Sequence, residues 1–130
     1  MCSEGGDCPS ILLVEDTPVN QKVALKMLKH LGFHPDLATN GLEALHALKN
    51  RLYDIVLMDI HMPQMDGLEA TKAIRQYLAH ADQPYIIAIT AYATSFDRAM
   101  CMSAGMDDYL SKPITIEDLK MAIFRYSGQQ

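Results

Sequence analysis

Five side chains that can bind a metal or a phosphoryl group stand directly after short apolar runs of the chain. They are Glu15, Asp16, Asp59, Thr90 and Lys112. Taken singly, each has an ordinary explanation, because aspartate caps turns, threonine enters helices and most lysines are solvated. If the apolar runs are parallel strands of one sheet, their carboxyl ends lie at the same edge. The pattern then predicts three carboxylates, one hydroxyl and one ammonium group close together.

Carboxylates gathered at one edge repel one another and lose hydration, so folding stability alone does not favour the arrangement. A divalent cation would resolve the conflict, and an all-oxygen ligand set favours Mg²⁺, with Mn²⁺ or Ca²⁺ as substitutes. We expect Asp16 and Asp59 to bind the ion directly and Glu15 to act through water. The backbone carbonyl of His61 would complete the ligand set.

Thr90 and Lys112 carry the groups that neutralise phosphoryl oxygens. The threonine hydroxyl donates a hydrogen bond, and the ammonium supplies a point charge. Together with the metal they would stabilise a transferring phosphoryl group, whose catalysis is mostly positioning and electrostatics. The Asp59 carboxylate would then be the nucleophile and would become an acyl phosphate.

The elements that must position these side chains alternate between strand and helix. Short apolar runs predict strands at residues 10–14, 33–38, 55–58, 85–89 and 108–110. Apolar residues at helical spacing predict helices at residues 18–31, 42–50, 67–78, 95–104 and 116–126. Pro35 weakens the second run and suits an edge strand. Strand–helix repeats with short links predict an α/β fold, in which helices cover both faces of one parallel sheet.

Local signals mark the helix ends. Thr17 before Pro18 predicts an N-cap with a first-turn proline, and Thr115 with Asp118 predicts a capping box. Gly105 closes the fourth helix. The predicted apolar face of the first helix consists of Val19, Val23, Met27, Leu28 and Leu31.

Length and composition bound the class of protein. The chain has 130 residues, which suits one domain, and its net charge is −5 without a basic stripe, so we expect no direct nucleic-acid binding. Cys2, Cys8 and Cys101 lack metal-ligand spacing, which indicates reduced thiols. No signal peptide or membrane-spanning apolar stretch is visible. We therefore expect a cytoplasmic domain that makes no membrane contact.

The composition also suggests where the folded part begins and ends. Residues 1–9 are small, polar and glycine-rich, which predicts a flexible N-terminal tail. We expect the folded domain over residues 10–127 and a frayed C-terminus over residues 128–130. No output domain fits after the last helix, so we expect either a stand-alone domain or a piece of a larger protein.

The chain resembles the receiver domain of two-component response regulators. The residues that carry the resemblance are 12–20 (LLVEDTPVN), 54–67 around Asp59, 89–91 (ITA) and Lys112-Pro113. It covers about Ser10 to Tyr126. The sequences of residues 18–20 (PVN) and 105–113 (GMDDYLSKP) are most similar to those of receivers attached to hybrid histidine kinases.

The resemblance implies a five-stranded, doubly wound (βα)5 sheet of flavodoxin-like order 2-1-3-4-5. It also implies that Asp59 accepts a phosphoryl group from a phosphohistidine on a histidine kinase or a histidine phosphotransfer domain. Asp16 and Asp59 would bind Mg²⁺, with Glu15 helping and the His61 carbonyl as a ligand. Such a domain is a signalling module that catalyses its own phosphoryl transfer and dephosphorylation, rather than a separate enzyme.

The same resemblance implies a switch. Thr90 would move toward the phosphoryl group and Tyr109 would turn inward with it. Lys112 would contact a phosphoryl oxygen, and its bond to Pro113 would be cis. The response would appear on the face formed by the fourth helix, fifth strand and fifth helix, where phosphorylation could also drive dimerisation.

Two other functions have the same general chemistry or the same sheet order. A magnesium-dependent phosphatase that passes through an aspartyl phosphate usually has a second acid two residues after the nucleophile, where this chain has His61. A flavin-binding module would have a Ser/Thr-rich phosphate loop after the first strand, where this chain has Glu15 and Asp16. Both positions count against these alternatives.

Overall fold

The structure, a computed structural model, describes residues 9–62, 65–91 and 94–128 of the chain. Strands and helices alternate through it, as the apolar pattern predicts. The strands are β1 (Ile11–Val14), β2 (Asp36–Ala38), β3 (Ile55–Asp59), β4 (Tyr85–Thr90) and β5 (Asp108–Ser111). The helices are α1 (Pro18–His30), α2 (Gly41–Asn50), α3 (Gly67–Tyr77), α4 (Ser95–Ala104) and α5 (Ile116–Gly128), and a 3-10 turn, η1 (His80–Asp82), precedes β4.

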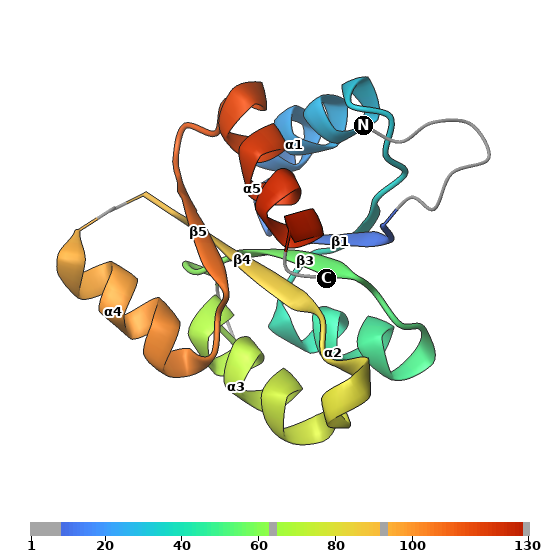
Figure 1. Ribbon diagram of the computed structural model, residues 1–130, viewed down its shortest axis with the longest axis vertical. Helices are drawn as coiled ribbons and strands as arrows, with labels where there is room; N and C mark the ends of the chain where they lie inside the picture. The colour runs from blue at the N-terminus through green and yellow to red at the C-terminus, as the bar shows by residue number, and fades with distance from the viewer. Residues whose placement is uncertain (1–8, 63–64, 92–93, 129–130) are drawn as a thin grey trace.

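The described strands form one parallel sheet in the order β2-β1-β3-β4-β5. Helices α1 and α5 cover one face of the sheet, and α2, α3 and α4 cover the other (Figure 1). Strand β3 lies at the centre, with Asp59 beside Ile89 of β4. The predicted doubly wound fold and its strand order are confirmed, and the carboxyl ends of all the strands lie at one edge.

The central strand is apolar throughout because helices cover both faces of the sheet. Val56 and Met58 belong to the core cluster beneath α2, α3 and α4, whereas Ile55 and Leu57 belong to the cluster beneath α1 and α5. All of these side chains are buried, and burying each one stabilises the fold by about 1.5–3 kcal/mol. Strand β3 is therefore firmly held at the point where it presents Asp59.

Side-chain caps begin helices α2 to α5. Asn40, Asp66, Thr94 and Thr115 each accept a hydrogen bond from the backbone N–H three residues later, at 2.8–3.1 Å. The predicted cap at Thr115 is thereby confirmed. At the other end of α4, Gly105 has φ of +105°, a left-handed conformation that favours glycine.

Helix α1 differs from the prediction in two ways. Thr17 occupies the N-cap position, but its side chain makes no cap hydrogen bond. Val19 and Val23 are 67% and 46% exposed, whereas Ala24 and Leu28 are buried against the sheet. The small side chain of Ala24 lets the helix approach the sheet closely, and this rotates the two valines toward solvent.

The second strand is shorter than the apolar run that predicts it. The apolar run predicts a strand over residues 33–38, but β2 begins at Asp36. The backbone N–H of Phe33 donates instead to the carbonyl of Leu28 at 2.9 Å, which ends α1. Pro35 has no N–H to add to a strand ladder. Phe33 is nevertheless buried, so it contributes to the core from a loop.

The described part of the chain begins with a contact between its start and the α2–β3 link. The backbone N–H of Ser10 donates to Asp54 Oδ2 at 2.8 Å, and the Asp54 N–H donates to the carbonyl of Ser10 at 2.9 Å. The predicted flexible tail and frayed end fall mainly on residues 1–8 and 129–130, which lie outside the described residues. Within the described residues, no helix has the length and hydropathy needed to cross a membrane.

Candidate functional site

Three carboxylates from the ends of β1 and β3 lie together. Each of Glu15, Asp16 and Asp59 offers an oxygen atom, and these oxygens lie within 4.8 Å of one another. Glu15 is 2% exposed and Asp59 is 1% exposed, whereas Asp16 is half-buried. The prediction that the acids gather at one edge of the sheet is confirmed. Two of the three are withdrawn from water, so the cluster carries a substantial electrostatic cost.

The Lys112 ammonium group lies between the two buried acids. Its Nζ is 3.4 Å from Asp59 Oδ1 and 3.6 Å from Glu15 Oε1. Lys112 follows the last residue of β5, and its backbone N–H donates to the Thr90 carbonyl at 2.8 Å. The peptide bond between Lys112 and Pro113 is cis, as the resemblance implies. The Lys112 side chain is 27% exposed, whereas that of Asp59 is buried.

Glu15 is held by backbone and side-chain contacts from several directions. Its N–H donates to the carbonyl of Ala38 at 3.0 Å, which extends the pairing of β1 with β2. Its carbonyl accepts a hydrogen bond from Gln21 Nε2 at 2.7 Å, and its Oε2 accepts one from the Thr17 N–H at 3.2 Å. The carboxylate therefore faces Asp59 in a defined position.

Burial raises the pKa of Glu15 to about 7. Withdrawal from water is the largest cause, and a hydrogen bond and charge repulsion with Asp59 raise the pKa further. The Thr17 N–H and the Lys112 ammonium oppose this shift. Near neutral pH, the Glu15 carboxyl therefore retains a proton for part of the time, and a divalent cation would displace that proton.

The loop after β3 holds Asp59 from the other side. The N–H of His61 donates to Asp59 Oδ1 at 3.3 Å, while the His61 side chain is exposed. A Cβ on Gly67 would overlap the Asp59 carbonyl, so the first turn of α3 packs directly on the strand end. The Gly67 N–H donates to the Ile60 carbonyl at 2.9 Å. Gly67 is thus a packing requirement of the site as well as part of a turn signal.

Thr90 and Tyr109 lie on β4 and β5. Thr90 is the last residue of β4 and is buried, one position beyond the residue that pairs with Asp59. Tyr109 is half-buried, and its ring packs beside the core cluster with the Arg98 guanidinium 5.0 Å from the ring centre. Their proposed movement on phosphorylation stays a prediction.

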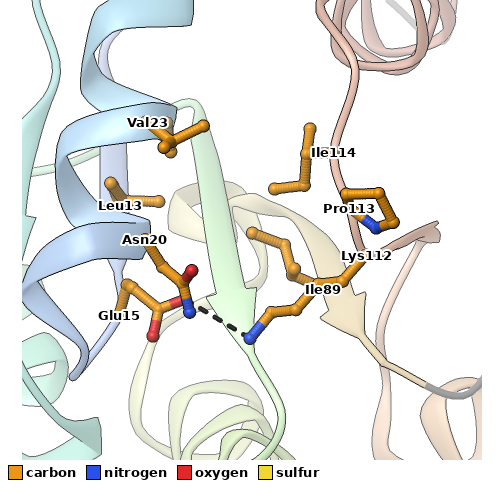
Figure 2. Close-up of a pocket in the computed structure, with 9 residues that line it drawn as sticks. Leu13, Glu15, Asn20, Val23, Ile89, Lys112, Pro113 and Ile114 are labelled. Carbon is orange, nitrogen blue, oxygen red and sulfur yellow. Dashed lines mark ion pairs between the residues drawn. The ribbon is translucent and has the colours of Figure 1, made fainter.

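A cavity of about 390 Å³ adjoins the acid cluster, between α1 and the link from β5 to α5. Figure 2 shows Glu15 and Lys112, joined by the dashed ion pair, at one end of the cavity with Asn20 beside them. Apolar side chains line the remainder: Leu13, Val23, Ala24, Ile89, Pro113 and Ile114. Sequence reasoning did not find this cavity, because its walls come from segments far apart in the chain.

Gln21 was also missed as a residue of the site. Its position on the first helix indicates a solvated side chain, yet its amide reaches back to the carbonyl of Glu15. A signal was available: Gln21 lies four residues after the N-cap Thr17, so its side chain projects over the first turn and toward the preceding loop.

The donor set of the cluster fits a hard divalent cation. Carboxylate oxygens are its preferred ligands, and two buried acids with one ammonium group leave excess negative charge for the ion to neutralise. We therefore regard Glu15, Asp16 and Asp59 as the candidate metal centre. The orientation of the His61 carbonyl toward this centre stays a prediction.

Known proteins share this fold and much of this sequence. The family described as response regulator receiver domain matches residues 11–124. Hybrid signal transduction histidine kinase G of Dictyostelium discoideum is 46% identical over 118 residues, which cover 89% of this chain. The chain spans 3% of the length of that relative.

Two solved structures are also closely similar. One is the receiver domain of sensor histidine kinase PA1611 from Pseudomonas aeruginosa PAO1, with a magnesium ion coordinated in its active site cleft. It is 41% identical with a TM-score of 0.84, covering 94% of this chain and 99% of that one. The other is the receiver domain of Ssk1 from Saccharomyces cerevisiae, in complex with the histidine phosphotransfer protein Ypd1. It is 29% identical with a TM-score of 0.84, covering 91% of this chain and 89% of that one.

The family match extends over nearly all of the described residues, and the acid cluster lies at the carboxyl edge of the sheet inside the matched range. This chain belongs to the response regulator receiver domain family and is a receiver domain of phosphorelay signalling.

Proposed function

We propose that the Asp59 carboxylate of this receiver domain accepts a phosphoryl group from a phosphohistidine, assisted by Mg²⁺. The observation that carries the proposal is the position of Asp59. It is buried at the end of the central strand, within 4.8 Å of two further carboxylates and 3.4 Å from the Lys112 ammonium. An exposed turn aspartate would have neither these neighbours nor this burial.

In the proposed reaction, an Asp59 oxygen attacks phosphorus and forms a P–O bond. The P–N bond breaks, and its electron pair returns to the imidazole of the donor histidine. Lys112 and the Thr90 hydroxyl contact phosphoryl oxygens and neutralise their charge. Asp16 and Asp59 would hold the ion directly, Glu15 would act through water and the His61 carbonyl would supply a further ligand. When bound, Mg²⁺ neutralises the negative charge of both the acids and the phosphoryl group.

The chain would also release its own phosphoryl group. Ala91 and the His61 side chain are exposed beside the strand ends, so water would approach an acyl phosphate on Asp59 from this side. His61 would tune the rate of this hydrolysis. Mn²⁺ or Ca²⁺ would substitute for Mg²⁺ because the donor set is all oxygen. The domain is then a self-catalysed signalling module rather than a separate enzyme.

The proposed partner is a sensor histidine kinase or a histidine phosphotransfer domain in the cytoplasm. Helix α1 supports this assignment, because Val19 and Val23 are exposed apolar residues of this helix. Val23 also lines the cavity that adjoins the acid cluster. A docked donor would cover them and place its histidine near Asp59. The structure of the Ssk1 receiver domain with Ypd1 gives a precedent for such a complex.

The proposed output is a change on the α4–β5–α5 face. Thr90 would move toward the phosphoryl group and Tyr109 would turn inward away from Arg98. Phe96 of α4 and Phe124 of α5 are exposed on these elements and provide apolar surface for a partner or a second copy of the chain. We propose that phosphorylation changes the affinity of this face, including for a dimer.

The test uses a small phosphodonor. Acetyl phosphate with Mg²⁺ should add one phosphoryl group to the wild-type domain, and intact mass under mild conditions should detect it. Asp59→Asn should abolish this addition, because an amide cannot act as the nucleophile. Asp82→Asn, in η1 beside the opposite edge of the sheet, is the matched control and should be phosphorylated like the wild type. Undiminished phosphorylation of Asp59→Asn would assign the acceptor to another residue.

A further inference from the structure

The loop that carries the acids between β1 and α1 has few attachments around Asp16. Among the described residues, the side chain of Asp16 has one hydrogen bond, a long one of 3.4 Å from the Thr17 hydroxyl. The N-cap side chain of α1 makes no cap bond that would fix the loop. Glu15 and Asp59 carry the same sign of charge as Asp16 when they are ionised, so they repel this acid rather than hold it. The position of this acid therefore depends on how its two chain neighbours are held.

Gln21 holds both of those neighbours. Its side-chain Nε2 donates to the carbonyl of Glu15 at 2.7 Å, and its backbone N–H donates to the carbonyl of Thr17 at 2.9 Å. The two carbonyls flank Asp16 on either side. The backbone bond is an ordinary first-turn bond of a helix, but the side-chain bond spans six residues and ties α1 to the end of β1.

We propose that Gln21 is a positioning residue of the metal centre, whose side-chain amide keeps Asp16 at the distance from Asp59 that a divalent cation requires. The amide suits this task because it adds no charge to the cluster and donates from a half-buried position. This inference rests on the proposed function, because it assigns the loop a role in binding Mg²⁺. Its consequence is a change in cation affinity rather than in the chemistry at Asp59.

A purely structural role would have a different signature. If the Gln21 amide merely stabilises the start of α1, its loss lowers the melting temperature and leaves the affinity for Mg²⁺ unchanged. If it positions Asp16, its loss weakens Mg²⁺ binding even in a fully folded protein. Calorimetric titration of the metal-free domain with MgCl₂ separates the two, since it measures binding without any phosphorylation.

The variants are Gln21→Met, which keeps the length of the side chain without the amide, and Gln21→Asn, which keeps the amide but shortens its reach. Both should bind Mg²⁺ about fivefold more weakly than the wild type, the effect of losing one neutral hydrogen bond. Gln76→Met, at an exposed glutamine of α3, is the matched control and should bind like the wild type. Circular dichroism in the absence of metal establishes that each variant is folded.

Wild-type affinity in both folded Gln21 variants would overturn the inference, whatever their melting temperatures. Loss of the native fold in both variants would also overturn it and make Gln21 a structural residue. A wild-type domain that does not bind Mg²⁺ would instead contradict the proposed function. The failure of one proposal is thus distinguishable from the failure of the other.

Discussion

The Lys112 ammonium faces two buried carboxylates and makes a tight ion pair with neither. Its distances of 3.4 Å to Asp59 and 3.6 Å to Glu15 exceed the roughly 2.8 Å of a close charge-assisted hydrogen bond. The lysine therefore compensates the cluster as a whole while its donors stay available for a third anion. A phosphoryl group on Asp59 would be that anion.

The pKa of Glu15 predicts how Mg²⁺ binding depends on pH. The folded value of about 7 exceeds the ordinary value of 4.5, because burial and Asp59 disfavour the carboxylate. Mg²⁺ competes with the proton on this group, so the apparent affinity should rise between pH 6 and pH 8. Calorimetric titrations at several pH values measure it. Glu15→Gln should flatten this dependence. If the affinity of the wild type for Mg²⁺ does not change between pH 6 and pH 8, the assignment to Glu15 is contradicted.

The raised pKa of Glu15 also makes the stability of the metal-free domain depend on pH. A carboxyl whose pKa is raised on folding stabilises the folded state below about pH 4.5, and this contribution is lost as the pH rises through about 7. The metal-free domain should therefore lose stability from this group between those values, and added Mg²⁺ should restore it most at the upper end. Thermal melts with EDTA and with Mg²⁺ at about pH 5 and about pH 7.5, on either side of this window, provide the comparison.

Lys112 is expected to matter for the reaction more than for folding. Lys112→Ala should slow phosphorylation by acetyl phosphate about a hundredfold, because a group that neutralises transition-state charge is lost. Its side chain is 27% exposed, so the melting temperature should change by only a few degrees. The exposed Lys72→Ala on α3 serves as the control for both measurements. A collapse of the thermal melt in Lys112→Ala would make the lysine structural.

At the scale of elements, Arg75 of α3 joins the ends of several segments at the edge of the sheet opposite the acid cluster. Its guanidinium donates to the carbonyls of Gly105 and Pro84, both at 2.8 Å, and to Gln83 Oε1 at 2.9 Å. It also pairs with Asp107 at 2.7 Å. These contacts fix the end of α4 and the amino ends of β4 and β5. Helix α4 and strands β4 and β5 are thus anchored at the edge of the sheet opposite the acid cluster.

This network predicts a stability effect without a functional one. Arg75→Met should lower the free energy of unfolding by about 2–3 kcal/mol. The Arg75 side chain is only 23% exposed, and its removal leaves several hydrogen-bond partners unpaired. Arg51→Met is the matched control, since its ion pair with Asp36 is about half exposed and contributes less than about 1 kcal/mol. Urea denaturation measures both. Phosphorylation by acetyl phosphate should persist in folded Arg75→Met, and its loss would show that this edge affects the site.

The elements themselves were largely predictable. Strand β3 and helix α4 follow from a continuous apolar run and from clear end signals such as Gly105. The exposed face of α1 was not predictable in this way. Val19 and Ala24 are both apolar, and a helical repeat cannot tell which of them meets the sheet. The sheet decides, because a small residue allows closer packing than a branched one.

At the scale of the whole molecule, parallel topology turns separate strand ends into one site. Asp59, Thr90 and Lys112 come from three strand ends that β3, β4 and β5 place side by side.

The flavin-binding alternative fails at the loop after β1, where acids replace hydroxyls. The phosphatase alternative lacks an acid at His61. The chain matches a small part of its long relatives, so the histidine-kinase context of those proteins remains a proposal for this one.

The amino-acid sequence by itself determined the fold class, the strand order through family resemblance, and the acids, threonine and lysine at the strand ends. It could do so because these features depend on local apolar period and on residue type. The tertiary structure alone decided the distances from Lys112 to Glu15 and Asp59 and the cavity beside them. It also decided the hydrogen bond from the Gln21 side chain to the Glu15 carbonyl. Those quantities arise from the packing of segments far apart in the chain, and no local pattern encodes the separation between two atoms that packing brings together.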